Sequence, residues 1–173
     1  MLGARATESN IKRLSKNGQL AQYRLLHFAT HAALAGELKG TTEPGLILTP
    51  GKKLDTKDDG FLSASEVARL RLDADWVVLS ACNTAASSAP EAEALSGLAR
   101  SFIYAGARAL LVSHWAVESV ATAKLVTETL VASRRRSVER AEALRLAIVN
   151  MIRSREGRLF HPMYWAPFVV VGG

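Results

Sequence analysis

One cysteine, Cys82, and one histidine, His31, carry the residue types most suited to chemistry in this sequence. Cysteine attacks a carbonyl carbon as the thiolate, and a thiol with its ordinary pKa of about 8.5 needs a neighbouring base or cation to form it at neutral pH. Histidine can take the thiol proton and then protonate a leaving amine. The two residues are 51 positions apart, so only the fold can bring them together. The alternatives are a small buried cysteine of the core and a hydrogen-bonded loop histidine.

The surrounding pattern predicts an α/β fold. Near-continuous apolar runs at 75–80 and 108–113 are typical of strands buried on both faces. Further strands are expected at 22–28, 45–49 and 167–171, and helices at 7–20, 92–104, 117–132 and 138–153. Turns at 50–51 and 58–60 predict a small hairpin, and Ser63 with Glu66 predicts a capping box. Strands that alternate with helices in this way indicate a mostly parallel sheet with helices on both faces.

The carboxyl ends of parallel strands meet at one edge of a sheet, and ligand sites of such folds lie there. The strand at 22–28 leads into His31, the strand at 75–80 leads into Cys82, and the strand at 108–113 leads into His114 and Trp115. We therefore expect these side chains to gather at one edge of the sheet.

Four motifs resemble the CHAT domain family, whose members are caspase-like domains usually fused to tetratricopeptide repeats. They are LLHFATHA, VVLSACNTA, GLARSFIYAGARALLVSHWAV and HPMYWAPFVVVGG, and the resemblance runs from about Leu2 to Gly173. It implies a caspase-like three-layer α/β sandwich, and it leaves open whether N-terminal strands of that fold are lacking. It also implies that residues 1–173 form one domain, expected to be the C-terminal part of a longer chain.

The same resemblance implies that His31 and Cys82 form the dyad of a cysteine endopeptidase. Such enzymes hold the oxyanion with two backbone N–H groups, which here belong to Ala32 and Cys82. The family usually has glycine where this chain has Ala32, and an apolar residue where it has His114. A catalytically silent protein-interaction module with the same fold is the alternative.

Glu93 and Glu118 are candidate specificity acids, because related enzymes often cleave after basic residues and a fixed carboxylate pairs with such a side chain. Both acids could instead stabilise a helix N-terminus through the helix dipole. His114 and Trp115 are candidate substrate contacts at the end of their strand.

No cofactor and no metal are expected. The segment from Asp55 to Glu66 resembles a calcium loop, but Lys57 occupies a ligand position, so we interpret the segment as a polar turn. A metal site of His31, Cys82 and His114 would lack any carboxylate. His27 and His31 have the spacing of helical metal ligands, but their segment is a predicted strand end.

Length and composition limit the classes of protein to which the chain can belong. The chain has 173 residues, 49% of them hydrophobic and 22% charged, which suits one globular domain and excludes disorder of the whole chain. A lone cysteine excludes an internal disulfide and fits a reducing, cytoplasmic location. No apolar run is long enough to span a membrane, and the N-terminus lacks the apolar core of a signal peptide.

The net charge of +6 comes mostly from residues 134–158, which hold eight arginines and three acidic residues. We interpret Arg134–Arg136 as a solvated cluster that complements a helix C-terminus; a docking patch for acidic partners or nucleic acid is the alternative. The expected partners are a protein or peptide substrate and either upstream tetratricopeptide repeats or a regulatory protein. We expect neither a membrane nor a nucleic acid as a partner.

Overall fold

The main sheet of the computed structural model has four strands in the order β1-β5-β6-β7. The structure describes residues 3–51, 58–80, 92–115, 117–135, 138–154 and 157–172, with the backbone alone at 92–96. The strands are β1 (Leu25–Phe28), β5 (Trp76–Leu79), β6 (Ala109–Ser113) and β7 (Phe168–Gly172). The first three are parallel and β7 is antiparallel to β6. The predicted mostly parallel α/β architecture is confirmed.

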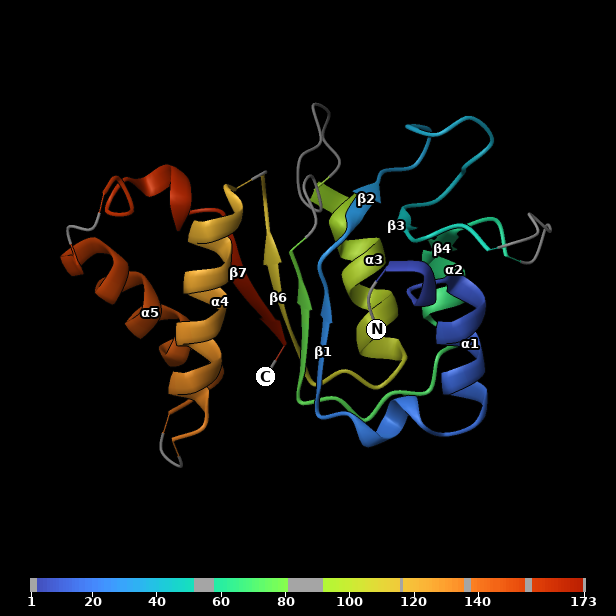
Figure 1. Cartoon of the computed structure of the whole chain (residues 1–173), viewed down its shortest axis with the longest axis horizontal. Coiled ribbons are helices and arrows are strands. Elements are labelled where there is room, and N and C mark those ends of the chain that lie inside the picture. The colour runs from blue at the N-terminus through green and yellow to red at the C-terminus, as the bar shows by residue number, and fades with distance from the viewer. Residues whose placement is uncertain are drawn as a thin grey trace.

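Helices cover both faces of this sheet (Figure 1). One face carries α1 (Glu8–Lys16), α2 (Ala64–Val67) and α3 (Ala92–Tyr104), and the other carries α4 (Ser119–Ser133) and α5 (Arg140–Ser154). Every residue of β5 and β6 is buried. Val77 and Leu79 pack into the core under α3, whereas Val78 and Leu111 pack into the core under α4 and α5. This burial on both faces explains the near-continuous apolar runs of the two strands.

A second, three-stranded sheet lies beyond the carboxyl end of β1. It contains β2 (His31–Ala33), β3 (Gly45–Ile47) and β4 (Phe61–Ser63), all antiparallel, in that order. The predicted hairpin corresponds to β3 and β4. No strand was predicted at β2, because the sequence analysis placed His31 simply beyond the end of the strand at 22–28. Its three residues become a strand because β3 offers a pairing edge, a tertiary effect that overrides weak local propensity.

The ends of the helices follow the local chemistry of the sequence. The Thr7 side chain caps α1 by accepting a hydrogen bond from the Asn10 N–H at 3.2 Å. The helix ends at Lys16 rather than near Leu20, because Gly18 adopts a φ of +70° and breaks the turn. The capping box of Ser63 and Glu66 is present at the start of α2.

The short 3₁₀ helices are η1 (Gly3–Arg5), η2 (Leu20–Gln22) and η3 (Pro162–Tyr164). Among the helices of the described ranges, none is both long enough and apolar enough to cross a bilayer.

Candidate functional site

The ends of β1 and β5 lie side by side. Phe28 and Leu79 are register partners, and the Ser80 N–H donates a hydrogen bond to the Phe28 carbonyl at 3.2 Å. The segments that lead to His31 and to Cys82 therefore leave adjacent, parallel strands at their carboxyl ends. Cys82 itself belongs to 81–91, outside the described residues, so the distance between the two side chains stays a prediction.

His27 and Ser80 connect these two strand ends through their side chains. The Nε2 atom of His27 lies 2.7 Å from the Oγ atom of Ser80. Desolvation of the imidazole, part of which still faces solvent, lowers the pKa of His27. His27 is thus a residue of β1 whose exposed side chain contacts a hydroxyl.

His31 is the first residue of β2 and its side chain is exposed. It lies opposite Ile47 of β3, and the Thr30 hydroxyl donates a hydrogen bond to the Ile47 carbonyl. Ala32 follows in the same strand, half-buried and opposite Leu46. Extended strand backbone is open to every residue type, so alanine is accommodated where the family usually has glycine.

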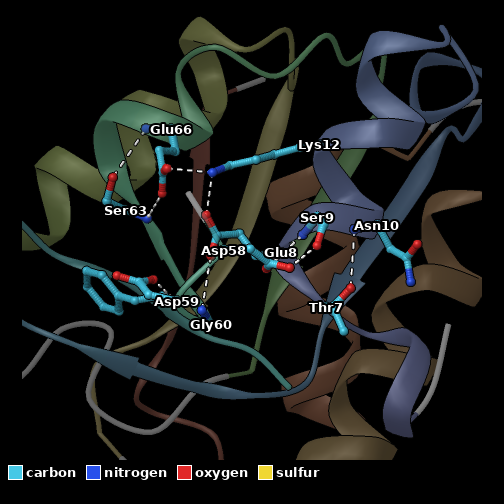
Figure 2. Close-up of polar contacts among 11 residues, drawn as sticks. Thr7, Glu8, Ser9, Asn10, Lys12, Asp58, Asp59, Gly60, Ser63 and Glu66 are labelled. Carbon is cyan, nitrogen blue, oxygen red and sulfur yellow. Dashed lines mark hydrogen bonds and ion pairs between the residues drawn. The ribbon is translucent and has the colours of Figure 1, made fainter. Parts of the chain in front are cut away.

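A polar network holds the small sheet against α1 (Figure 2). The buried Glu8 carboxylate accepts a hydrogen bond from the Gly60 N–H at 3.1 Å, directly before β4. Lys12, one turn further along α1, donates to Glu8 and to Glu66, and Nζ lies 2.5 Å from the Glu66 carboxylate. The Asp58 carboxylate accepts from the backbone N–H and the hydroxyl of Ser9.

The pKa values of this network follow its burial and pairing. Burial raises the pKa of Glu8, and the hydrogen bond from Lys12 only partly opposes this effect. For Lys12, burial alone would lower the pKa, but hydrogen bonds to Glu66 and Glu8 raise it overall. For Glu66, burial would raise the pKa, but hydrogen bonds from Lys12 and Ser63 lower it overall. Lys12 therefore stays charged between Glu8 and Glu66, and the carboxyl group of Glu8 ionises less readily than an exposed one.

Strand pairing connects these contacts of α1 to His31. Phe61 follows Gly60 and pairs with Ile47, and Ile47 pairs with His31. Glu8 and Lys12 are thus positioning residues for the small sheet. Neither residue was expected from the sequence, although their i, i+4 spacing of opposite charges and the capping box at Ser63 are visible signals.

The candidate substrate-binding residues have varied surroundings. Glu118 is the N-cap of α4, where its carboxylate accepts hydrogen bonds from the N–H groups of Val120 and Ala121. Glu93 belongs to the first turn of α3, and its side chain lies outside the described part of the structure. The helix-terminus alternative thus holds for Glu118, whereas a specificity role for either acid stays a prediction.

Two further candidates, His114 and Trp115, follow β6, the strand next to β5, as expected. His114 is exposed, and its N–H donates to the Pro167 carbonyl at 2.9 Å. The Trp115 indole is 42% exposed and donates to the Met163 carbonyl at 3.2 Å. The indole thereby ties the end of β6 to η3 while its ring still faces solvent.

No group of three or more His, Cys, Asp or Glu side chains suited to a metal ion occurs among the described residues. In the calcium-like segment, 55–57 fall outside them, Asp59 accepts from the Phe61 N–H at 2.8 Å, and Glu66 is paired with Lys12. Both carboxylates are therefore already engaged, in agreement with a polar turn.

Strands that end side by side, a second sheet that carries His31, and helices on both faces define a caspase-like α/β domain. The sequence model of the CHAT domain family matches residues 1–173, so the chain belongs to that family. Tetratricopeptide repeat protein 28 of Mus musculus is 26% identical over 199 aligned residues, which cover 99% of this chain. The chain spans only 8% of the length of that relative.

Proposed function

We propose that this chain is a cysteine endopeptidase module in which Cys82 is the nucleophile and His31 is the general base and then the general acid. The single observation that supports the proposal most is the register of Phe28 with Leu79, since the segments leading to the two residues start from adjacent, parallel strand ends. The exposure of His31 agrees with a ring that can meet a substrate.

In the proposed reaction, His31 takes the Cys82 proton, and the thiolate attacks the scissile carbonyl carbon. The N–H groups of Cys82 and Ala32 stabilise the oxyanion of the tetrahedral intermediate. His31 then gives the proton to the leaving amine as the C–N bond breaks, which leaves a thioester on Cys82. A water molecule, deprotonated by His31, hydrolyses the thioester, releases the acid product and restores the thiol. None of these reaction steps uses a metal or a cofactor.

The test is cleavage of quenched fluorescent peptides by the wild-type chain, Cys82→Ala and His31→Gln. We expect both variants to lose cleavage and to keep the thermal stability of the wild type, because His31 is exposed and Cys82 is predicted to lie in a loop. Iodoacetamide labelling adds a second readout: His31→Gln should slow the alkylation of Cys82 at pH 7, because the thiolate loses its base. Full cleavage by Cys82→Ala would remove Cys82 from the mechanism.

The finer features of this proposal concern substrate and context. We propose a preference for Arg or Lys before the scissile bond, set by Glu93 or Glu118, with His114 and Trp115 in contact with the substrate. The relative is named for tetratricopeptide repeats. We accordingly propose that this single domain is the C-terminal part of a longer, cytoplasmic protein in which such repeats, or a regulatory protein, control the activity.

A catalytically silent interaction module is the second candidate, and the repeat-protein name of the relative supports it. The two candidates differ in the reactivity of Cys82. Alkylation of Cys82 in the native chain no faster than that of free cysteine, together with no peptide cleavage, would favour the interaction module.

A further inference from the structure

A basic hollow lies between α1 and the segment that follows α2. Its volume is about 580 Å³, and its walls come from the second half of α1 and from residues 66–71. None of its lining residues belongs to a strand. The chain enters α1 at the opposite end of the helix, where Thr7 is the N-cap. The opening of the basic hollow therefore does not depend on how either sheet is continued.

Positive charge dominates the basic hollow. Its charged lining residues are Lys12, Lys16, Arg69, Arg71 and Glu66. Four cations and one carboxylate give the lining a formal charge of +3. The carboxylate of Glu66 is already bound, because Nζ of Lys12 lies 2.5 Å from it and the Ser63 N–H donates to it at 3.1 Å (Figure 2).

Three of the four cations have no acidic residue to neutralise them. Lys16, Arg69 and Arg71 are exposed, and none of them has an ion-pair partner among the residues that the structure describes. Lys12, by contrast, binds Glu66. Cations that gather without counter-charges repel one another. An anionic ligand in the basic hollow would therefore relieve this repulsion as well as form new ion pairs.

The backbone that carries the two arginines is held in place. Leu70, which lies between them, is 5% exposed and packs into the core under α3. The Arg71 N–H donates a hydrogen bond at 2.8 Å to the hydroxyl of Ser15, which is itself buried in α1. The Arg69 N–H donates to the Glu66 carbonyl at 3.1 Å. A ligand would not have to order this backbone, which lowers the cost of binding.

The chemistry of the lining selects among anionic ligands. Among the described lining residues there is no aromatic ring on which a nucleobase could stack, and Leu70 is the apolar one. Phosphate sites typically combine cations with the N–H groups of a helix N-terminus, whereas the basic hollow lies at the carboxyl-terminal end of α1, whose dipole opposes a dense negative charge. Carboxylates spread along a peptide suit separate cations, and each can accept two hydrogen bonds from an arginine.

We propose that the basic hollow binds an acidic segment of a partner protein, whose carboxylates pair with Lys16, Arg69 and Arg71. The segment would lie beside the ion pair of Lys12 and Glu66, which belongs to the network that holds the small sheet. A second copy of this chain fits less well, because the chain carries a net charge of +6. The inference goes beyond peptide hydrolysis and does not depend on the proposed dyad.

The probe is an acetylated, amidated hexaglutamate peptide with a fluorescent label, titrated into the full chain and followed by anisotropy. We expect binding that weakens with added salt, because the paired charges are exposed to solvent. Hexalysine with the same label should bind at least about tenfold more weakly, since like charges repel. No binding of hexaglutamate would overturn the proposal.

Two matched pairs of substitutions locate the site. Arg69→Gln with Arg71→Gln should weaken hexaglutamate binding about five- to tenfold, because two surface ion pairs are lost. Arg134→Gln with Arg135→Gln removes the same charge from two other exposed arginines and should leave the affinity unchanged within about twofold. All four side chains are exposed, so both double variants should unfold at the temperature of the wild type. Equal losses of affinity in the two pairs would overturn the proposal.

Zero-length cross-linking reports the contact directly. A carbodiimide activates the carboxylates of bound hexaglutamate, which then form amide bonds with lysine amines beside them. Peptide mapping by mass spectrometry should find far more cross-link at Lys16 than at Lys39, an exposed lysine between β2 and β3. The cross-link at Lys16 should be lost in Arg69→Gln with Arg71→Gln. Equal yields at the two lysines would refute the assignment of the site.

A phosphate competitor tests the other class of anion. Sodium tripolyphosphate should not displace hexaglutamate at the concentration at which unlabelled hexaglutamate does so. Displacement at a concentration at least about tenfold lower, lost in Arg69→Gln with Arg71→Gln, would assign the basic hollow to a phosphorylated ligand and refute the acidic protein segment.

Discussion

The imidazole of His27 and the hydroxyl of Ser80 lie 2.7 Å apart and connect the ends of β1 and β5. His27 is four residues before His31, and Ser80 is two residues before Cys82. The contact therefore adds a side-chain link to the backbone register at the point where both segments of the proposed dyad begin. His27 lies in β1 and Ser80 directly follows β5, so the contact helps to position the two strand ends, and neither residue belongs to the proposed reacting pair.

The stability of the chain should depend on pH through His27. Partial desolvation of the solvent-exposed imidazole lowers its pKa, so the unfolded chain binds a proton more readily than the folded chain does, by an amount that solvent screening keeps small. The neutral ring contributes stability above the unfolded pKa of about 6.5, and this contribution is lost as the pH falls through the lower folded pKa. We expect the free energy of unfolding, measured in urea, to fall less between pH 7 and pH 5 in His27→Gln than in the wild type. His114→Gln is the control, and equal pH profiles for wild type and His27→Gln would contradict the prediction.

The network around Lys12 should contribute to stability. Among the described residues, Lys12→Met leaves the buried Glu8 carboxylate with the Gly60 N–H as its hydrogen-bond donor, and we expect a loss of about 1–3 kcal/mol in the free energy of unfolding. Adding Glu8→Gln to Lys12→Met should recover part of that loss, because the unpaired charge is removed. Arg145→Met, which breaks the exposed pair with Glu142, should have no measurable effect. Additive effects of the two network substitutions would argue against the coupling.

Ala32→Gly should not raise peptide cleavage. Ala32 lies in β2 opposite Leu46, so its backbone is extended and carries no strain for glycine to relieve. The glycine variant should instead lose about 0.5–1 kcal/mol of stability, because glycine gives up more chain entropy in a strand. Thermal unfolding and a parallel peptide assay measure both effects. Higher turnover in Ala32→Gly would show that the oxyanion N–H needs a different backbone geometry.

Gly106 should be intolerant of any side chain. Its φ is +109°, and a Cβ atom would lie 2.3 Å from the Leu72 carbonyl oxygen. We expect Gly106→Ala to cost at least about 3 kcal/mol, from backbone strain and the clash together. Gly18→Ala also has a positive φ but meets nothing within 4 Å, so its cost should be about 1 kcal/mol. Similar losses for both variants would mean that Leu72 moves to make room.

A peptide assay should show whether Glu93 or Glu118 sets the proposed preference for Arg or Lys before the scissile bond. Peptides with Arg, Lys, Asp or Leu before the scissile bond are compared on wild type, Glu93→Gln and Glu118→Gln. We expect one variant to lose the preference for Arg and Lys, since the charge partner of the substrate is removed. Glu118→Gln should also lose about 0.5–1 kcal/mol of stability, because Glu118 caps α4. Indifference of both variants to the peptide series would refute the pocket while leaving the dyad untouched.

Local sequence patterns were sufficient to predict most strands of the main sheet. The buried strands β5 and β6 were visible as apolar runs, because both faces of each strand meet a core. The capping box of Ser63 and Glu66 was visible because it depends on a neighbour three residues away. The parallel order of β1 and β5 followed from the alternation of strands and helices.

Only the tertiary structure decided where His31 lies within these elements. The strand β2 exists because β3 pairs with it, and β3 is held through β4, Gly60 and Glu8, residues far apart along the chain. Pairing across such distances depends on which edges meet, and no local propensity encodes this. The basic hollow could not be predicted from the sequence either, because it is lined by side chains of α1 and of the segment after α2, which meet only in the fold.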